Sequence, residues 1–366
     1  MSQASRNAIL PRSPNPIRRG RLACGAVGFL LLTAGVFWYQ FSGLGVDAAQ
    51  PQWHDLRWSY LVLLLFCLPI ETATCALRTW VMTRILEPRV NLWTCIKAEW
   101  ANVAISTLTP TQSWGGPGQI YVLSRGGASV GTSLTIMLLS CIATLVALLA
   151  LALYSLVVAS TDGAWPLFLT VVWSFVGIGS AMAFVAIWPG LFRAALAALP
   201  RRMAAKLVDL IDTYRTDVSR FLRQGKAALA CVCLLSVPFP IARVLIAYLC
   251  LRFLGIEASD FRHIFEAQLV LILFEFFAPS PGGAGIMEVA SLAVMGELVP
   301  AGYAPYYNLL WRSSTLYLPA LTGFVCLAWT VFHDTWRRSI RSTWDRSLRT
   351  DGSQSAGGRA RLERLS

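Results

Sequence analysis

Long apolar segments constrain this chain more than any other feature of its sequence. A helix needs roughly 20 apolar residues to cross about 30 Å of hydrocarbon, and within hydrocarbon the backbone must satisfy its own hydrogen bonds. Only 14% of the 366 residues are charged, against roughly 25% in a soluble domain. We therefore predict an all-α integral membrane protein with about six transmembrane helices. The six segments are residues 21–41, 58–77, 133–159, 166–187, 227–249 and 305–331.

The basic residues indicate how these helices are oriented. Lys and Arg are concentrated before the first segment, after the second, between the fourth and fifth, and after the last. Cytoplasmic loops carry the excess of Lys and Arg, so we expect both termini in the cytoplasm and a multi-pass location in the cytoplasmic (inner) membrane. The first segment follows arginines, as a secretory signal does. Its apolar run over 22–41 exceeds the roughly 7–15 residues of a signal core, so we interpret it as a retained helix.

Two shorter apolar segments, 94–108 and 264–278, run into breaks rich in proline and glycine. Each reaches only about 22 Å as a helix, which is too short to cross. The distribution of Lys and Arg predicts that the first segment enters from the cytoplasm and the second from outside. Since neither can cross, both are predicted to be re-entrant hairpins. Their breaks are alike, with STLTPTQSWGGPGQIY at 106–121 and FFAPSPGGAGIME at 276–288.

The two hairpins occupy equivalent places in the chain. Each follows two predicted helices and precedes a third, so residues 21–159 and 166–331 are predicted to form an inverted-topology repeat. Interrupted helices in such repeats are typical of transporters, and their breaks point to the binding site.

The remaining segments lie on the cytoplasmic side of the predicted transmembrane domain, 21–331. Residues 190–226 alternate apolar and basic positions, which predicts an amphipathic helix on the cytoplasmic leaflet. Residues 1–20 form a basic cytoplasmic N-terminus, and residues 332–366 form a basic tail that we expect to be disordered.

Glycines at the two breaks are the first candidate for function. They allow tight turns and a close approach of the backbone, and turn amides at a helix N-terminus can hold an anion. The alternative is that they only let helices pack closely. The two clusters are Gly115, Gly116 and Gly118, and Gly282, Gly283 and Gly285.

Ionisable residues inside the predicted membrane segments are the second candidate. They are costly there and usually face a pathway or one another. Glu71, Arg243 and Arg312 lie within predicted crossings. The hairpins contribute Glu99, Glu275, Glu288 and Arg125. Buried arginine suits phosphate binding, but an Arg–Glu pair that locks a hairpin to a helix is an equal alternative. Arg78 and Lys97 are expected to extend toward the interface.

Other chemistries have little support in the sequence. The three histidines lie at predicted interfaces, and the nine cysteines show no metal-ligand spacing. We expect no metal, no cofactor and no enzymatic activity, although a reaction based on an intramembrane glutamate stays open. The basic runs flank apolar segments, so the expected partners are anionic lipid headgroups rather than nucleic acid. The sequence leaves the oligomeric state unknown.

Three stretches, 109–131, 279–290 and 308–323, resemble the lysylphosphatidylglycerol synthase transmembrane-region family, a flippase-like integral membrane domain. The chain resembles a stand-alone member without the family's aminoacyl-transferase domain. It departs from the family pattern at Pro117, where a charged residue often follows the first glycine pair, and at the bulky Trp114. The resemblance implies that a lipid headgroup moves between leaflets.

The prediction is therefore a lipid flippase-like transporter of a phospholipid or of an isoprenoid-linked or aminoacylated headgroup. One alternative is a non-catalytic subunit that docks a cytosolic lipid- or glycan-synthesis enzyme; another is an intramembrane lipid-modifying enzyme. The resemblance implies that residues of the two motifs belong to the site, and the intramembrane charges are added from the residues themselves. The predicted substrate-binding residues are Pro110, Gly115, Gly116, Gly118, Tyr121, Arg125, Pro279, Pro281, Gly282, Gly283, Gly285, Glu288, Arg312, Arg243 and Glu71.

Overall fold

A computed structural model describes residues 19–42, 51–109, 115–159, 200–257 and 261–332, together with short helical pieces between 166 and 180. Helices and the turns between them make up these residues, which confirms the predicted all-α class. The helices are α1 (Arg19–Ser42), α2 (Trp58–Leu86), α3 (Leu92–Leu108), α4 (Gly116–Arg125), α5 (Val130–Ala159), α8 (Arg201–Gln224), α9 (Lys226–Ser236), α10 (Pro238–Phe253), α11 (Phe261–Phe277), α12 (Ile286–Met295) and α13 (Ala304–Arg312).

Four helical stretches are long and apolar enough to cross a membrane: Trp58–Leu86, Val130–Val157, Lys226–Phe253 and Ala301–Phe332. Large apolar side chains such as Phe66 point outward from them, as expected for contact with lipid. The chain is therefore a multi-pass membrane protein. The predicted segment 21–41 is helical in α1, whereas 166–187 lies largely outside the described residues, so the number of crossings stays a prediction.

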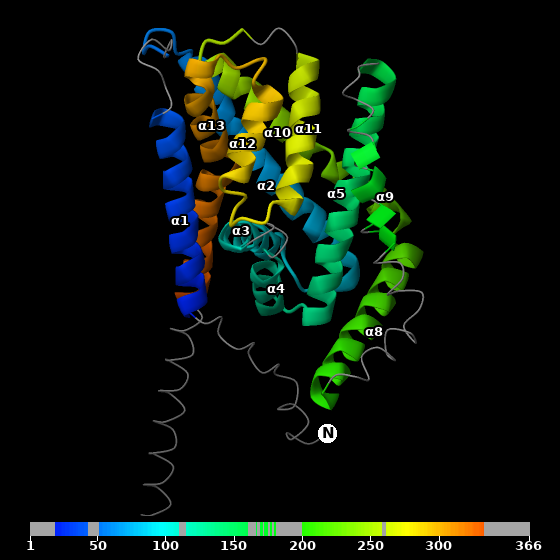
Figure 1. The fold of residues 1–366 in the computed structure, drawn as a ribbon. Coiled ribbons are helices and arrows are strands. Elements are labelled where there is room, and N and C mark those ends of the chain that lie inside the picture. Colours follow the sequence, from blue (N-terminus) through cyan, green and yellow to red (C-terminus); the bar gives the residue numbers. More distant parts are fainter. Residues whose placement is uncertain are drawn as a thin grey trace, which may run out of the picture.

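The two predicted hairpins are pairs of short helices in opposite halves of the molecule. In Figure 1, α3 and α4 occupy the lower half, α11 and α12 occupy the upper half, and the broken ends of both pairs lie near mid-height. This is the arrangement expected of two segments that enter from opposite faces. Pro110, within the first break, lies outside the described residues.

Two of the spanning stretches depart from regular α-helix. Residues 226–253 bend between α9 and α10 at Pro238, because proline lacks the amide hydrogen that continues the helical ladder. The last stretch changes to a π-helix over Ser313–Tyr317, immediately after Arg312. Single π-turns are frequent at functional sites.

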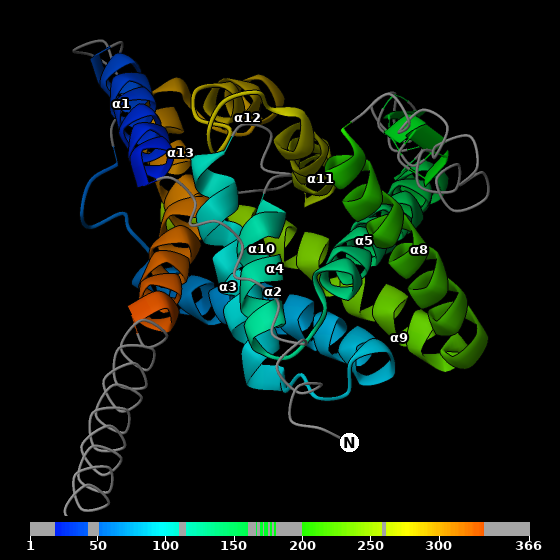
Figure 2. The same cartoon turned by 90° about the horizontal axis from the view of Figure 1, so that it is seen from below.

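The core lies between α2, α10 and the second hairpin. Helix α10 packs extensively along α2 and also contacts α11 and α13. Leu64, Ile246, Leu251 and Ile264 are almost fully buried there. Seen from below in Figure 2, α3 and α4 lie centrally, with α1 and the last helix on one side and α5, α8 and α9 on the other. The charged residues described below therefore lie within a packed frame.

Helix α8 corresponds to the predicted amphipathic segment, and it packs against α5. Its Asp217 is buried and interacts with Thr132 and Thr135 of α5. Burial raises the pKa of this carboxyl, and the two threonine hydroxyls partly oppose the shift. This contact gives α8 a polar interaction with α5 in addition to its apolar packing.

Candidate functional site

The first glycine cluster serves close packing. Gly115 has an ordinary helical conformation, with φ of −62°, and Gly116 begins α4. A Cβ atom on Gly116 would collide with the Met137 sulfur, and one on Gly118 would collide with the Ala101 carbonyl oxygen. The described glycines of this break therefore bring α4 against α3 and α5, as the packing alternative held.

The second glycine cluster forms a left-handed turn. Gly282, Gly283 and Gly285 have φ values of 59°, 69° and 84°, a region that other residues enter only with strain. The Gly283 amide donates to the Ser280 carbonyl, and the Ala284 amide donates to that of Pro281, each at 3.0 Å. Here the glycines serve backbone conformation, and the prediction of a tight turn is confirmed. Pro279 and Pro281 lie in this turn.

Arg312 and Glu288 meet at this turn. Arg312 Nε donates to Glu288 Oε1 at 2.8 Å, and Nη2 donates to the Gly282 carbonyl. Glu288 Oε2 accepts from the Gly285 amide at 2.7 Å, so the protein's own carboxylate occupies the N-terminus of α12. Both side chains are about 1% exposed. The ion pair thus joins the last helix to the second break.

One hydrogen-bond donor of the Arg312 guanidinium is not used in this ion pair. Arg312 Nη1 has no hydrogen-bond partner among the described residues, although Tyr317 lies beside the guanidinium. Tyr317 packs edge-on against Phe29 and Phe37 of α1. Helix α1 therefore covers the side of the site on which Tyr317 lies.

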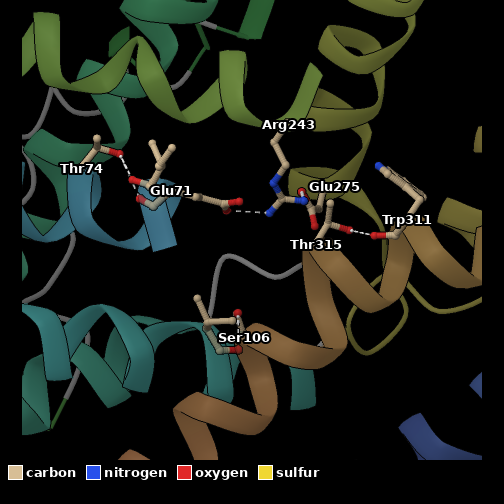
Figure 3. A network of polar contacts seen from close by, with 9 residues as sticks. Glu71, Thr74, Ser106, Arg243, Glu275, Trp311 and Thr315 are labelled. Carbon is tan, nitrogen blue, oxygen red and sulfur yellow. Dashed lines mark hydrogen bonds and ion pairs between the residues drawn. The ribbon is translucent and has the colours of Figure 1, made fainter. Parts of the chain in front are cut away.

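A second charged cluster lies between α2, α10 and α11. Arg243 Nη2 lies 3.0 Å from Glu71 Oε1, and Arg243 Nη1 lies 3.4 Å from Glu275 Oε2. Figure 3 shows the guanidinium between the two carboxylates, with Thr315 of the last helix nearby and Ser106, near the end of α3, below the network. The cluster connects both long central helices to the second hairpin.

A third cluster belongs to the first hairpin. Arg78 is 6% exposed, and it donates to Thr144 at 2.8 Å and to Ser236 at 3.1 Å. Glu99 accepts from Thr79 at 2.6 Å and from Gln119 at 2.9 Å. The expectation that Arg78 extends to the interface is wrong, because α2 continues eight residues beyond it to Leu86, about 12 Å of helix.

Two predicted site residues lie elsewhere. Arg125 is exposed at the end of α4, with its guanidinium 5.8 Å from the centre of the half-buried Tyr121 ring. The structure thus brings Arg312 to Glu288 and Arg243 to Glu71, but it places Arg125 in neither cluster.

The sequence did not assign Glu275, Glu99 or Arg78 to the site. Glu275 and Glu99 were recognised as hairpin glutamates, and their position just before a break was the available signal. Arg78 gave no signal, because hydropathy alone ends its helix too early. No group of three His, Cys, Asp or Glu side chains arranged to hold a metal occurs among the described residues.

These features define a class: multi-pass helical membrane proteins with two broken-helix hairpins and, at the second break, buried ion pairs. The chain belongs to the family described as lysylphosphatidylglycerol synthase TM region, whose model matches residues 25–323. The match spans both hairpins and every charged cluster described above, so the resemblance seen in the sequence is confirmed. It connects the chain with membrane lipids. No curated protein matches the sequence.

Proposed function

We propose that the chain is a non-enzymatic lipid transporter that moves a phospholipid or lipid-linked headgroup between the leaflets of the cytoplasmic membrane, with both termini in the cytoplasm. The observation that carries the proposal is Arg312, a fully buried arginine at a broken helix with one donor unpartnered among the described residues. Guanidinium donors match phosphate oxygens, and interrupted helices mark substrate sites in transporters.

The two break-associated clusters differ in what they can bind. Arg312 has a single carboxylate partner and a spare donor, so it suits the phosphate that glycerophospholipids share. Glu288 beside it offers carboxylate oxygens to an amine, as an aminoacylated headgroup would carry. Arg243 lies between two carboxylates, which makes its surroundings unfavourable for a phosphate.

Reconstitution of the full chain into phosphatidylglycerol vesicles tests the proposal. The probes are phosphatidylglycerol and lysylphosphatidylglycerol with a fluorescent acyl chain, and a membrane-impermeant quencher reports the outer leaflet. We expect the protein to expose inner-leaflet probe. Arg312→Lys should slow this by at least about tenfold, because losing one charge-assisted hydrogen bond costs at least about 1.4 kcal/mol.

The control is Arg57→Lys, since Arg57 forms an exposed pair with Glu257. It should behave as the wild type does. If the wild-type protein moves neither probe, the proposed function is wrong. Recovery of a chemically altered lipid from the vesicles would instead support the intramembrane enzyme.

A further inference from the structure

The Glu71–Arg243–Glu275 cluster carries more negative than positive charge. One guanidinium faces two carboxylates, at 3.0 Å and 3.4 Å, so three ionised groups would leave a net charge of −1. The side chains of Arg243, Glu71 and Glu275 are 9%, 16% and 10% exposed. An unbalanced charge so deep in a membrane protein is costly unless something neutralises it.

The surrounding residues do not supply the missing positive charge. From α2, Cys75 faces Glu71 and Arg243, and a thiol adds no positive charge. Arg78 and Glu99 also act on Cys75, but they balance each other. The last helix contributes Thr315 and Trp311, which are neutral (Figure 3). The described residues around the cluster therefore leave its charge at −1.

Glu275 has an oxygen available for a ligand. Its Oε1 atom is buried and has no hydrogen-bond partner among the described residues, and the same holds for Arg243 Nε. The residue as a whole is 8% exposed. A carboxylate oxygen in this situation is a site for a proton, because protonation removes the buried charge and supplies a donor.

We propose that the Glu71–Arg243–Glu275 cluster binds one proton on one of its two carboxylates, and that loading and release of this proton drive the lipid movement. The second half of this statement rests on the proposed function, whereas the first does not. The proton enters from water and returns to water. The Arg312–Glu288 pair differs from this cluster, because it has one charge of each sign and needs no proton to be neutral.

The positions of the three residues explain how a proton would act on the hairpin. Glu275 belongs to α11 of the second hairpin, while Arg243 and Glu71 belong to α10 and α2, within the spanning stretches Lys226–Phe253 and Trp58–Leu86. With the proton bound, the attraction between Glu275 and Arg243 is weakened. Without it, the carboxylate is drawn to the guanidinium, which fixes the hairpin against the two long helices. Protonation thus controls how firmly the hairpin is held.

Infrared difference spectroscopy of the purified full chain tests the proton site without any lipid. The Asp217→Asn background is used, because burial also raises the pKa of the Asp217 carboxyl. In this background, spectra compared between mildly acidic and mildly alkaline buffer should contain the C=O stretch of a protonated carboxyl. Glu275→Gln and Glu71→Gln should each abolish it, because each leaves one carboxylate to pair with Arg243. Glu257→Gln, in the exposed pair with Arg57, should retain it.

Any of three outcomes would overturn the proton site. The carboxyl C=O band could persist in all variants, or it could be absent from the protein with the intact cluster. The spectrum could also change when sodium replaces choline as the buffer cation, without any carboxyl band. Size-exclusion profiles and helix content establish that each variant is folded. Both glutamine variants preserve side-chain shape and neutralise the cluster, so we expect both to fold. Either one alone suffices for the test.

The vesicle assay with an imposed pH gradient tests the coupling. If one proton moves with each lipid, one pH unit should change the steady-state leaflet ratio of the probe up to about tenfold. Glu275→Gln should abolish this dependence on the gradient. Probe movement that ignores the gradient in the wild type would overturn the coupling alone. A wild type that moves no probe would overturn the proposed function, while the infrared band would still decide the proton site.

Discussion

Replacing Arg312 by methionine should destabilise the protein strongly, because the substitution strands a buried carboxylate. Methionine fills similar space without charge. Glu288, 1% exposed, would keep only the Gly285 amide as partner, and the Gly282 carbonyl would lose its donor. Breaking a buried ion pair from one side costs about 3–5 kcal/mol. We expect a loss of unfolding free energy in that range.

The double variant Arg312→Met, Glu288→Met separates the ion pair from the packing. Replacing both partners of a buried pair by apolar residues is often close to neutral, although here the Gly282 carbonyl and Gly285 amide each lose a partner, at about 1–3 kcal/mol per group. The double variant should therefore be less destabilised than the sum of the two single variants, with a coupling of about 2 kcal/mol or more.

Detergent titration in mixed micelles measures these free energies, with thiol labelling as the signal. Cys95 and Cys250 are fully buried, so they become reactive only on unfolding. The exposed-pair variant Arg57→Met should change stability by about 0–1 kcal/mol. Single-variant effects that add within about 0.5 kcal/mol would show that Arg312 and Glu288 do not interact, and the site described here would be refuted.

Three further predictions concern packing, pH and the first hairpin. Gly118→Ala should destabilise the protein by about 1–3 kcal/mol, since its Cβ has no room, whereas Gly35→Ala, with open space around it, should be neutral or slightly stabilising in the same titration. The raised pKa of Asp217 means that its contribution to stability is full below about pH 4, the ordinary aspartate pKa, and is lost as pH rises through the raised value. Asp217→Asn should therefore raise the melting temperature at neutral pH and remove this fall, unlike Asp209→Asn at an exposed site of the same helix. Arg78→Lys should lower the melting temperature by several degrees, because one ammonium cannot reproduce the guanidinium contacts to two hydroxyls.

Length and charge were enough to predict the all-α class and the positions of the four stretches that are long enough to cross a membrane. The length of an apolar segment does not depend on which face of a helix is buried, so it identified these four stretches although many of their large apolar side chains are exposed. The basic residues then required the two short segments to lie in opposite halves, as Figure 1 shows. The bend at Pro238 was also foreseeable, because proline interrupts the helical ladder wherever it falls inside one.

The matched glycine motifs misled where the backbone differs. At Gly282 and Gly283 glycine allows a backbone with positive φ. At Gly116 and Gly118 glycine instead allows close helix packing. Spacing in a sequence carries no information on φ, and neighbours such as Met137 become visible only once α5 has been placed. The two breaks are therefore equivalent in their position in the fold, but their described glycines differ in conformation.

The charges show where the two halves cease to be equivalent. Each half places an arginine on the long helix before its hairpin and a glutamate on the first helix of that hairpin: Arg78 with Glu99, and Arg243 with Glu275. Glu71 is the additional charge, and although it belongs to α2 of the first half it pairs with Arg243 of the second. The excess negative charge thus lies where one half meets the other. In transporters built from inverted repeats, rocking of one repeat against the other provides alternating access. The proposed proton would therefore act where the two proposed repeats would have to separate.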